Sequence, residues 1–448
     1  MIKEKTLEKQ SAIWIPSSDI KIKPEIKFFE ILDSFLSKIG FGQFVRELCA
    51  SYYCPDKGCR PPIDPEVYFK MLMVGFFENL RSERGIASRC ADSFSIRHFL
   101  HYDINESTPD HSSLSVIRRR LPQSVNYRVF SFILAEMKKQ GLVIGKNLAV
   151  DSSVMEANAS LRNLKNRMTE ESYQEYIKKL AAENGVDTND NAAVARFDRK
   201  RKDRKTSNAE WYNPYEPDAK IGKKKDGATD MIYKPENVVD LDTGAIIDAN
   251  LLDGDTADST DFSEKIINAQ ARLNDISDDP TQADLVESAT TDKGYYDTDE
   301  ITELRDNGIV CVIPDRIEHR NLEKLNENQA NAVITTREIV KSEDGKDLLK
   351  RRGMHVERSF AHILDCGGMR RTTLKRNENI AKRYIIAAAC YNLSMIMRLT
   401  FGIGTLKQAI ASNYSIANIC KYMLQSIQKH IEDFIRLFSF TLSKNINF

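Results

Sequence analysis

The spacing of apolar residues predicts that residues 1–140 form an all-helical domain. Asp64-Pro65 marks the start of one helix, because Asp caps free backbone N–H groups and Pro fits the first helical position. The residues that follow at helical spacing are Val67, Met71, Leu72, Val74 and Phe77. They form one apolar face, so we expect this helix to pack against others.

A second predicted helix begins at Ser82 and extends through Phe94 toward Phe99. A break at residues 107–110 separates it from a basic helix, Leu114–Leu121. The basic residues of that helix are Arg118, Arg119 and Arg120. Short helices with a basic last helix are typical of DNA-binding units of the helix-turn-helix type. The alternative is that these arginines are only solvated charges at the end of a helix.

Beyond residue 140 the pattern changes to short apolar runs that predict strands and helices in alternation. The predicted strands are Asn147–Asp151, Asn237–Leu241, Ala245–Leu251, Asp284–Asp292 and Ile309–Ile313. The predicted helices between them are Ser259–Leu273 and Asp297–Asp306. This order predicts an α/β domain at residues 141–400, with a mixed sheet covered by helices.

A polar, partly helical insertion at about residues 161–230 interrupts this domain after its first strand. It is rich in Lys and Arg, and its candidate DNA-binding residues are Arg199, Arg201, Lys202 and Trp211. Loops of this length are usually functional or disordered. Residues 401–448 predict C-terminal helices with an apolar cluster of Phe434, Leu437, Phe438 and Phe440.

Composition limits the class of protein. The 448 residues carry a formal net charge of zero, which argues mildly against a protein that simply coats nucleic acid. Residues 1–10 are polar and charged, so we expect no signal peptide and a cytoplasmic, nucleoid-associated protein with free thiols. The most apolar stretch, Tyr384–Gly404, contains Asn392 and Arg398, so we expect a buried helix and no membrane partner.

Three acids are candidates for chemistry: Asp151, Asp292 and Glu357. The two aspartates close predicted strands, where functional groups of open sheets gather. Glu357 lies beside an apolar stripe on a predicted helix, so we expect it to turn toward the sheet. Three carboxylates would suit two Mg²⁺ ions, with Mn²⁺ as a substitute, and such ions promote phosphodiester cleavage. Taken singly, each of these acids is explained equally well as a cap residue or as a solvated surface charge.

The contexts of these acids resemble the signature blocks of DDE transposases from bacterial insertion sequences. The blocks are Asp151-Ser-Ser-Val-Met-Glu-Ala-Asn-Ala, Thr291-Asp-Lys-Gly-Tyr-Tyr, Val356-Glu-Arg-Ser-Phe and Tyr391-Asn-Leu. Upstream blocks are also similar to the family, among them Asp64-Pro-Glu, Ser82-Glu-Arg, Arg97-His-Phe-Leu, Thr108-Pro-Asp-His-Ser-Ser-Leu-Ser and Asn208-Ala-Glu-Trp-Tyr-Asn-Pro. The resemblance covers about residues 60–400, with the blocks in the family's order.

The resemblance implies an RNase H-like catalytic fold in which Asp151, Asp292 and Glu357 are the catalytic, metal-binding acids. It also implies a transposase that binds the terminal inverted repeats of its element as double-stranded DNA. Such an enzyme cleaves the ends and transfers them to target DNA, works as a homodimer because two ends must be paired, and needs no cofactor beyond the metal. A catalytically silent DNA-binding repressor and a cellular nuclease of the same fold are the alternatives.

The third block departs from the family pattern. Many relatives have Tyr and Arg ahead of the Glu and a Lys seven residues after it, whereas here position 364 is Leu. The candidates for the basic residue that orients the DNA end are Lys293, Arg352 and Arg358. Trp211 could stack on an unpaired base, although packing inside the insertion is the favoured alternative.

Overall fold

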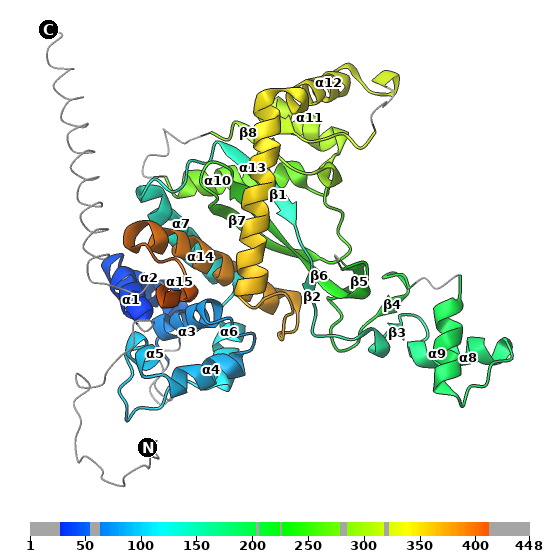
Figure 1. Cartoon of the computed structure of the whole chain (residues 1–448), viewed down its shortest axis with the longest axis horizontal. Helices are drawn as coiled ribbons and strands as arrows, with labels where there is room; N and C mark the ends of the chain where they lie inside the picture. Colours follow the sequence, from blue (N-terminus) through cyan, green and yellow to red (C-terminus); the bar gives the residue numbers. More distant parts are fainter. Residues whose placement is uncertain are drawn as a thin grey trace, which may run out of the picture.

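The protein is described from a computed structural model, which covers residues 27–53, 63–202, 206–224, 226–277, 285–317 and 322–411. The predicted apolar cluster around Phe434–Phe440 therefore lies outside the described residues. Figure 1 shows a group of N-terminal helices on one side, a sheet with its own helices in the middle, and a small module that projects from the opposite side.

The N-terminal part is all-helical within its described residues, as the apolar spacing predicts. Its elements are α1 (Lys27–Lys38), α2 (Phe41–Cys49), η3 (Ala50–Tyr52), α3 (Pro65–Phe77), α4 (Glu83–Asp92), α5 (Phe94–Phe99), α6 (His111–Arg120) and α7 (Gln123–Lys139). The predicted helix start is confirmed, because the Asp64 side chain accepts a hydrogen bond from Glu66 N at 2.8 Å.

The prediction of one helix from Ser82 toward Phe99 is wrong, because the chain breaks at Ser93. Ser93 has an extended backbone, and its hydroxyl accepts a hydrogen bond from Ile96 N, which caps α5. Serine side chains compete for backbone N–H groups in this way and so favour helix starts over helix interiors. The break leaves Phe94 54% exposed.

The longest strand of the central sheet is β6 (Thr229–Asp240). The other strands are β1 (Asn147–Ser152), β2 (Met155–Glu156), β5 (Lys220–Lys223), β7 (Ile246–Asp253), β8 (Ser288–Thr290) and β9 (Val310–Val312). β7 and β1 pair with β6 in antiparallel fashion, and β8 and β9 continue the sheet parallel to β1. The order β7-β6-β1-β8-β9 is that of an RNase H-like sheet, so the predicted fold class is confirmed.

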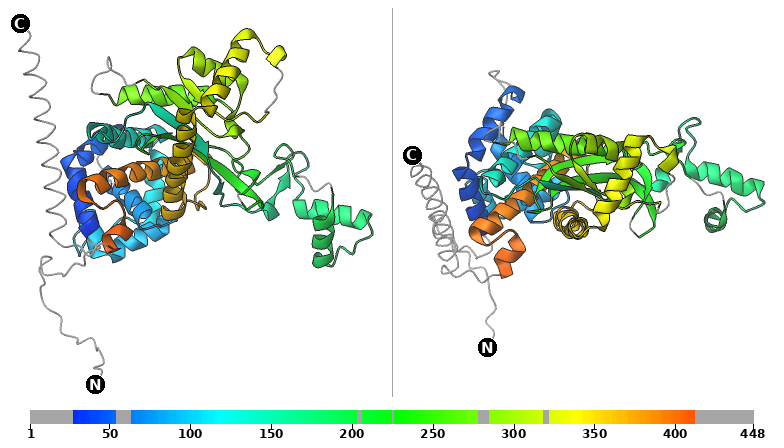
Figure 2. Two further views of the ribbon diagram at one scale, coloured as in Figure 1. Left: turned by 45° about the horizontal axis from the view of Figure 1, so that its top comes forward. Right: turned by 90° about the horizontal axis from the view of Figure 1, so that it is seen from above.

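Helices flank this sheet. They are α10 (Phe262–Asp275), η6 (Lys293–Tyr295), α11 (Thr298–Asp306), η7 (Leu322–Lys324), α12 (Glu327–Lys341), α13 (Glu343–Phe360), a π-helical segment at Ala361–Cys366, α14 (Asn377–Phe401) and α15 (Leu406–Ala411). α13 is the long yellow helix that runs past the sheet in Figure 1, and the views of Figure 2 place it along one face.

The projecting module corresponds to the predicted polar insertion. It consists of η4 (Leu161–Asn163), β3 (Lys165–Asn166), α8 (Tyr173–Glu183), α9 (Asn191–Lys200) and β4 (Trp211–Tyr212). β3 and β4 form their own two-stranded sheet, and α8 and α9 have a small core of Ile177, Ala181 and Val194. β5 then returns the chain to the main sheet, where it pairs with the start of β6.

α14 joins the two large parts of the molecule. It lies between the N-terminal helices and the sheet (Figures 1 and 2), and nearly its whole length is buried. Lys382 Nζ donates to Arg118 O of α6 at 3.1 Å, and Tyr384 Oη donates to Asn237 of β6 at 2.7 Å. The side chain of Asn392 accepts from Ile246 N at 3.0 Å and donates to Ile246 O at 2.8 Å.

The prediction that the apolar stretch is a buried helix is confirmed. Among the described residues one helical span, Asn377–Ile410, is long and apolar enough to cross a membrane by composition, but 67% of its apolar window is buried inside the protein. The span belongs to the core of this fold and is not a membrane span.

We expect Asn392→Leu to lower the free energy of unfolding by about 3 kcal/mol, because two buried backbone groups of Ile246 would lose their partner. Ser394→Ala is the matched control. Ser394 is equally buried, but its hydroxyl bonds only Tyr391 O of its own helix. We expect this control to cost about 1 kcal/mol or less. Urea unfolding of the two variants measures both values, and equal losses would contradict the role given to Asn392.

Candidate active site

Asp151 lies on β1 near its carboxyl end, opposite Asn237 of β6. Its side chain is 24% exposed, and its Oδ1 accepts a hydrogen bond from Ser152 N at 2.8 Å. The pKa of the Asp151 carboxyl is raised to about 6, mainly because burial disfavours its charged form. Arg352 and the Ser152 N–H lower this pKa, whereas the nearby Asp292 and Asp258 carboxylates add to the rise.

Asp292 comes two residues after β8, where its side chain caps η6 and accepts from Gly294 N at 2.7 Å. β1 and β8 are adjacent and parallel, so their carboxyl ends share one edge of the sheet. The Asp292 charge acts on the pKa of Asp151, as expected for neighbouring carboxylates. The two aspartates at strand ends are therefore brought together.

A third carboxylate at this edge, Asp258, was missed by the sequence reasoning. It lies in the loop after β7, where its Oδ1 accepts from Ser152 Oγ at 2.8 Å and pairs with Lys234 Nζ at 2.6 Å. No strand end or periodic pattern marks this residue, since it belongs to an irregular polar loop. Its place follows only from the course of that loop across the sheet edge.

Glu357 is not brought together with the two aspartates in this structure, contrary to the expectation that it turns toward the sheet. The stripe beside it is buried as expected, through Val356 and Phe360, but Glu357 itself is exposed. On a helix each residue is turned by about 100° from the one before it. Because Val356 and Phe360 are buried, Glu357 lies on a side of the helix that is exposed to solvent.

Polar contacts of Arg351, Arg352 and Ser359 fix the rotation of α13. Arg352 Nη1 pairs with Asp151 Oδ2 at 2.9 Å, and the hydroxyl of Ser359 accepts from the Asn237 side chain at 3.0 Å. The next arginine, Arg351, instead pairs with Asp242 and Asp347, each at 2.8 Å. Arg352 thus supplies the positive charge nearest to the buried Asp151 carboxylate.

The donor set at this edge suits Mg²⁺ or Mn²⁺, because aspartate oxygens are hard ligands. Among the residues that the structure describes, however, no three His, Cys, Asp or Glu side chains are arranged to bind one ion. Asp151 and Asp292 fit such a site by chemistry and position. A third ligand is not in place, and Asp151 Oδ2 is already paired with the guanidinium of Arg352.

The candidate DNA-binding Arg and Lys residues other than Arg352 divide into two groups. Arg118 is held inside the protein by Glu83, and its side chain is 12% exposed. Arg201 is held by Asp198 at 3.0 Å, with 9% exposure. The candidates with exposed side chains are Arg119, Arg120, Arg199, Lys202, Lys293 and Arg358.

Arg316 is a further cation at the site that the sequence reasoning did not find. Its guanidinium donates to Lys293 O at 2.6 Å and to Gly294 O at 3.0 Å, so it clamps the loop that follows Asp292. The residue is otherwise exposed. It adds positive charge beside the aspartates, where a phosphate group would need it.

Trp211 is buried, with 4% exposure, and packs edge-on against Tyr173 at 5.2 Å and tilted against Tyr176 at 5.4 Å between ring centroids. A ring enclosed in this way has no free face for a base. The structure thus favours packing within the insertion, the alternative weighed beside base stacking.

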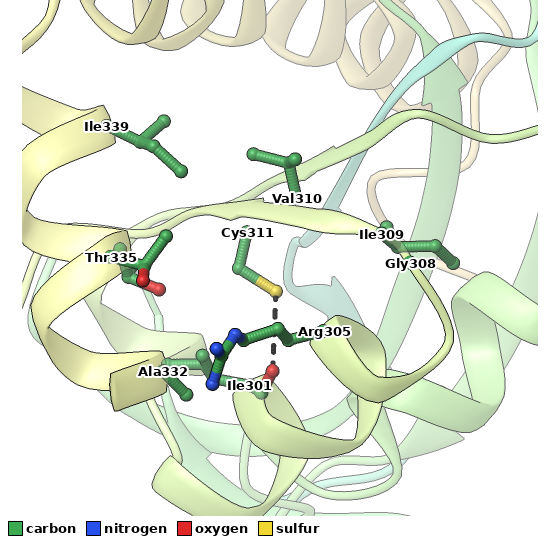
Figure 3. A pocket seen from close by; sticks show the side chains of 10 residues that line it. Ile301, Arg305, Gly308, Ile309, Val310, Cys311, Ala332, Thr335 and Ile339 are labelled. Atoms are coloured by element: carbon green, nitrogen blue, oxygen red, sulfur yellow. Dashed lines mark hydrogen bonds between the residues drawn. The ribbon is translucent and has the colours of Figure 1, made fainter. Parts of the chain in front are cut away.

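A small apolar pocket lies between α11, β9 and α12 (Figure 3). Its lining includes Ile301, Ile309, Cys311, Ala332 and Ile339, and the Cys311 thiol points to Ile301 O. No carboxylate lines it. This pocket is thus separate from the aspartates and lacks the groups for phosphodiester chemistry.

Comparison with protein families gives two matches. Residues 19–120 match the model of a transposase domain (DUF772), and residues 149–393, more than half of the chain, match the model of the transposase DDE domain. The second match contains all three candidate acids. No curated protein and no solved structure matches the chain.

We expect Trp211→Ala to loosen the insertion, because removal of a buried Trp costs about 3–5 kcal/mol. Limited proteolysis should then cut the α8–α9 module faster than in the parent protein. Tyr215→Ala, an aromatic of the same insertion that is 63% exposed, serves as the control and should change the cutting rate little. Equal protease resistance of Trp211→Ala and the parent would contradict a packing role.

Proposed function

Because this chain belongs to the transposase DDE family and is a DNA transposase, we propose that it binds the terminal inverted repeats of a mobile element, cleaves them and transfers the strands to target DNA. This proposal rests on one observation: the carboxyl groups of Asp151 and Asp292 lie near each other at one sheet edge within the matched domain. We propose that the DNA is bound by a homodimer in the bacterial cytoplasm, since two ends must be held together for transfer.

In this proposal Asp151, Asp292 and Glu357 hold two Mg²⁺ ions, for which Mn²⁺ can substitute. Bound ions of this kind activate an attacking water or 3′-hydroxyl and stabilise the leaving oxygen of the phosphodiester. Asp292 contributes a carboxylate oxygen at the sheet edge, and Asp151 contributes Oδ2 once Arg352 has left it. The Ser152 N–H and the Gly294 N–H fix the orientation of these two carboxyl groups.

Glu357 completes the site after a change in α13. The helix passes directly into the π-helical segment Ala361–Cys366, and π-helical turns occur frequently at functional sites. Release of Arg352 from Asp151 removes one of the polar contacts that hold α13 in its present rotation. Arg352 then has a free guanidinium for a phosphate at the DNA end.

The DNA path is proposed from the exposed cations. Lys293 and Arg316 lie at the loop that follows Asp292, and Arg358 is exposed on α13. Arg119 and Arg120 end α6 of the helical part, and Arg199 and Lys202 lie at the end of α9. We propose residues 1–140 as the end-binding part, 141–400 as the catalytic domain with its insertion, and 401–448 as C-terminal helices.

Asp151→Asn, Asp292→Asn and Glu357→Gln should each lower cleavage of end-containing DNA by about a thousandfold or more, because several kcal/mol of transition-state stabilisation would be lost. Binding of the same DNA should remain, measured by gel shift. Glu343→Gln is the matched control, since Glu343 lies on the same helix with a side chain 91% exposed. Parent-like cleavage by any one of the three variants would remove that residue from the site.

Strand transfer distinguishes a transposase mechanism from the two alternatives. Purified protein with Mg²⁺ should bind inverted-repeat ends as a dimer and join them to a target plasmid, and chelation by EDTA should abolish both cutting and joining. Cutting without joined products would support a nuclease. Binding without any cutting would support a silent repressor.

A further inference from the structure

A basic segment connects the π-helical segment to α14. Residues 370–376 carry four cations and no acid. The first cation, Arg370, is neutralised, because its guanidinium donates twice to Asp365, each time at 2.9 Å. The second, Arg371, is only loosely paired, at 3.9 Å from Glu156, and its side chain is 57% exposed. Arg371 is therefore accessible to an anion from solvent.

The start of this segment lies beside the catalytic edge. It bonds to β2, because Glu156 N donates to Arg370 O and Thr372 N donates to Glu156 O, each at 2.9 Å. Arg370 Nη1 also donates to Val154 O at 3.4 Å. Val154 is three residues after Asp151, so their Cα atoms are at most about 11 Å apart. A DNA strand that reaches Asp151 would therefore pass close to this segment.

The helical part adds a cation to the same surface. Thr373 Oγ1 donates to Arg81 O at 2.9 Å. A Cβ added to Gly368 would lie 3.3 Å from Arg81 Cγ, so the stem of this arginine packs against the loop that precedes the segment. Arg81 is exposed in the turn between α3 and α4, and among the residues that the structure describes no carboxylate pairs with it. The two large parts of the molecule thus meet at a basic surface.

The insertion holds the other end of the segment. The Lys375 ammonium lies 5.7 Å from the centroid of the Tyr215 ring, and Tyr215 is 63% exposed. Arg376 N donates to Glu216 Oε1 at 2.7 Å. Lys375 and Arg376 are both exposed, and no carboxylate in the described part of the chain pairs with either side chain. We call the four exposed cations the junction strip: Arg81, Arg371, Lys375 and Arg376.

The junction strip differs from other cations of this protein, which its own acids neutralise. Arg118, for example, is paired with Glu83 and largely buried. Glu156 lies near Arg371 but is bound more closely by Lys224, at 3.2 Å. The strip is therefore left as a positive surface for an external anion. Duplex DNA carries one negative charge per about 1.7 Å of its axis, so it complements such a row of cations.

We propose that the junction strip binds the phosphate backbone of the DNA end, between the helical part and the catalytic edge. Contacts to phosphates fix the register and orientation of a duplex but carry no sequence information. The strip therefore positions the end for cleavage, and the repeat sequence is read elsewhere. The inference rests on the proposed function, because it places DNA between the part proposed to bind the repeat and the acids proposed to cut it.

The test measures how the Kd of the full chain for DNA depends on salt, with an end-containing duplex and a duplex of scrambled sequence. Each phosphate contact contributes about 0.9 to the slope of log Kd against log salt concentration. Arg371→Gln combined with Lys375→Gln should therefore lower this slope by about 2. Because the strip reads no bases, binding of both duplexes should weaken alike.

Lys341→Gln combined with Lys346→Gln is the matched control, because it removes the same charge from two exposed lysines at the other end of α13. This helix has 18 residues and is about 27 Å long, which separates the control from the strip. The control should keep the slope of the parent. Circular dichroism and the thermal midpoint check that each double variant is folded.

The outcomes separate this inference from the proposed function. An unchanged slope in Arg371→Gln/Lys375→Gln overturns the inference, and a preference of the parent for end-containing DNA then leaves the proposed function intact. Equal losses in the two double variants also overturn it, since net charge alone would explain them. If instead the strip variant changes only the association state in sedimentation, the strip is a contact between copies of the chain and the inference fails. If the parent binds both duplexes equally, end recognition fails, whereas a lowered slope in the strip variant still supports the strip.

Discussion

The burial of α14 is the constraint on which the rest of the structure depends. The helix fills the space between the N-terminal helices and the sheet, so apolar residues of both parts share one continuous core. It carries cations into that interface: Lys382 is 3% exposed and Arg383 9%. Burial of such groups is costly unless they are paired, and here they donate to Arg118 O and Leu80 O of the helical part. These contacts fix how the helical part is oriented toward the catalytic edge.

At the catalytic edge, cations and hydrogen-bond donors offset the cost of burying carboxylates. Asp151 lies deep enough that its pKa is raised, yet Arg352 is placed to stabilise its charged form. Glu236 of β6 is also a buried acid. Its Oε1 is paired with Lys265 Nζ at 2.9 Å and accepts a hydrogen bond from Tyr295 Oη at 2.9 Å. Each of these two carboxylates therefore has a cation and a hydrogen-bond donor of its own.

The sequence predicts the parts of the site that depend on local pattern. Asp151 and Asp292 follow apolar runs, and parallel pairing of β1 and β8 brings such ends together. The direction of Glu357 is not predictable in this way. Helix periodicity places it beside the stripe, but the rotation of α13 is decided by tertiary contacts of Arg352 and Ser359. Loop residues such as Asp258 and Arg316 carry no periodic signal at all. Likewise, the break at Ser93 depends on one hydroxyl that competes with the helix.

The position of α14 near the end of the described chain also orders events during synthesis. The helical part, β1 and Asp292 all leave the ribosome before Asn377–Phe401 does. Until then Ile246 and Asn237 lack the side chains that hold them in the finished protein. Since chains are made from the amino terminus, the sheet edge that carries Asp151 and Asp292 gains this support only after residues 377–401 have been made. A chain that stops before residue 377 would therefore lack the hydrogen bonds that Asn392 and Tyr384 make to Ile246 and to Asn237, the strand partner of Asp151.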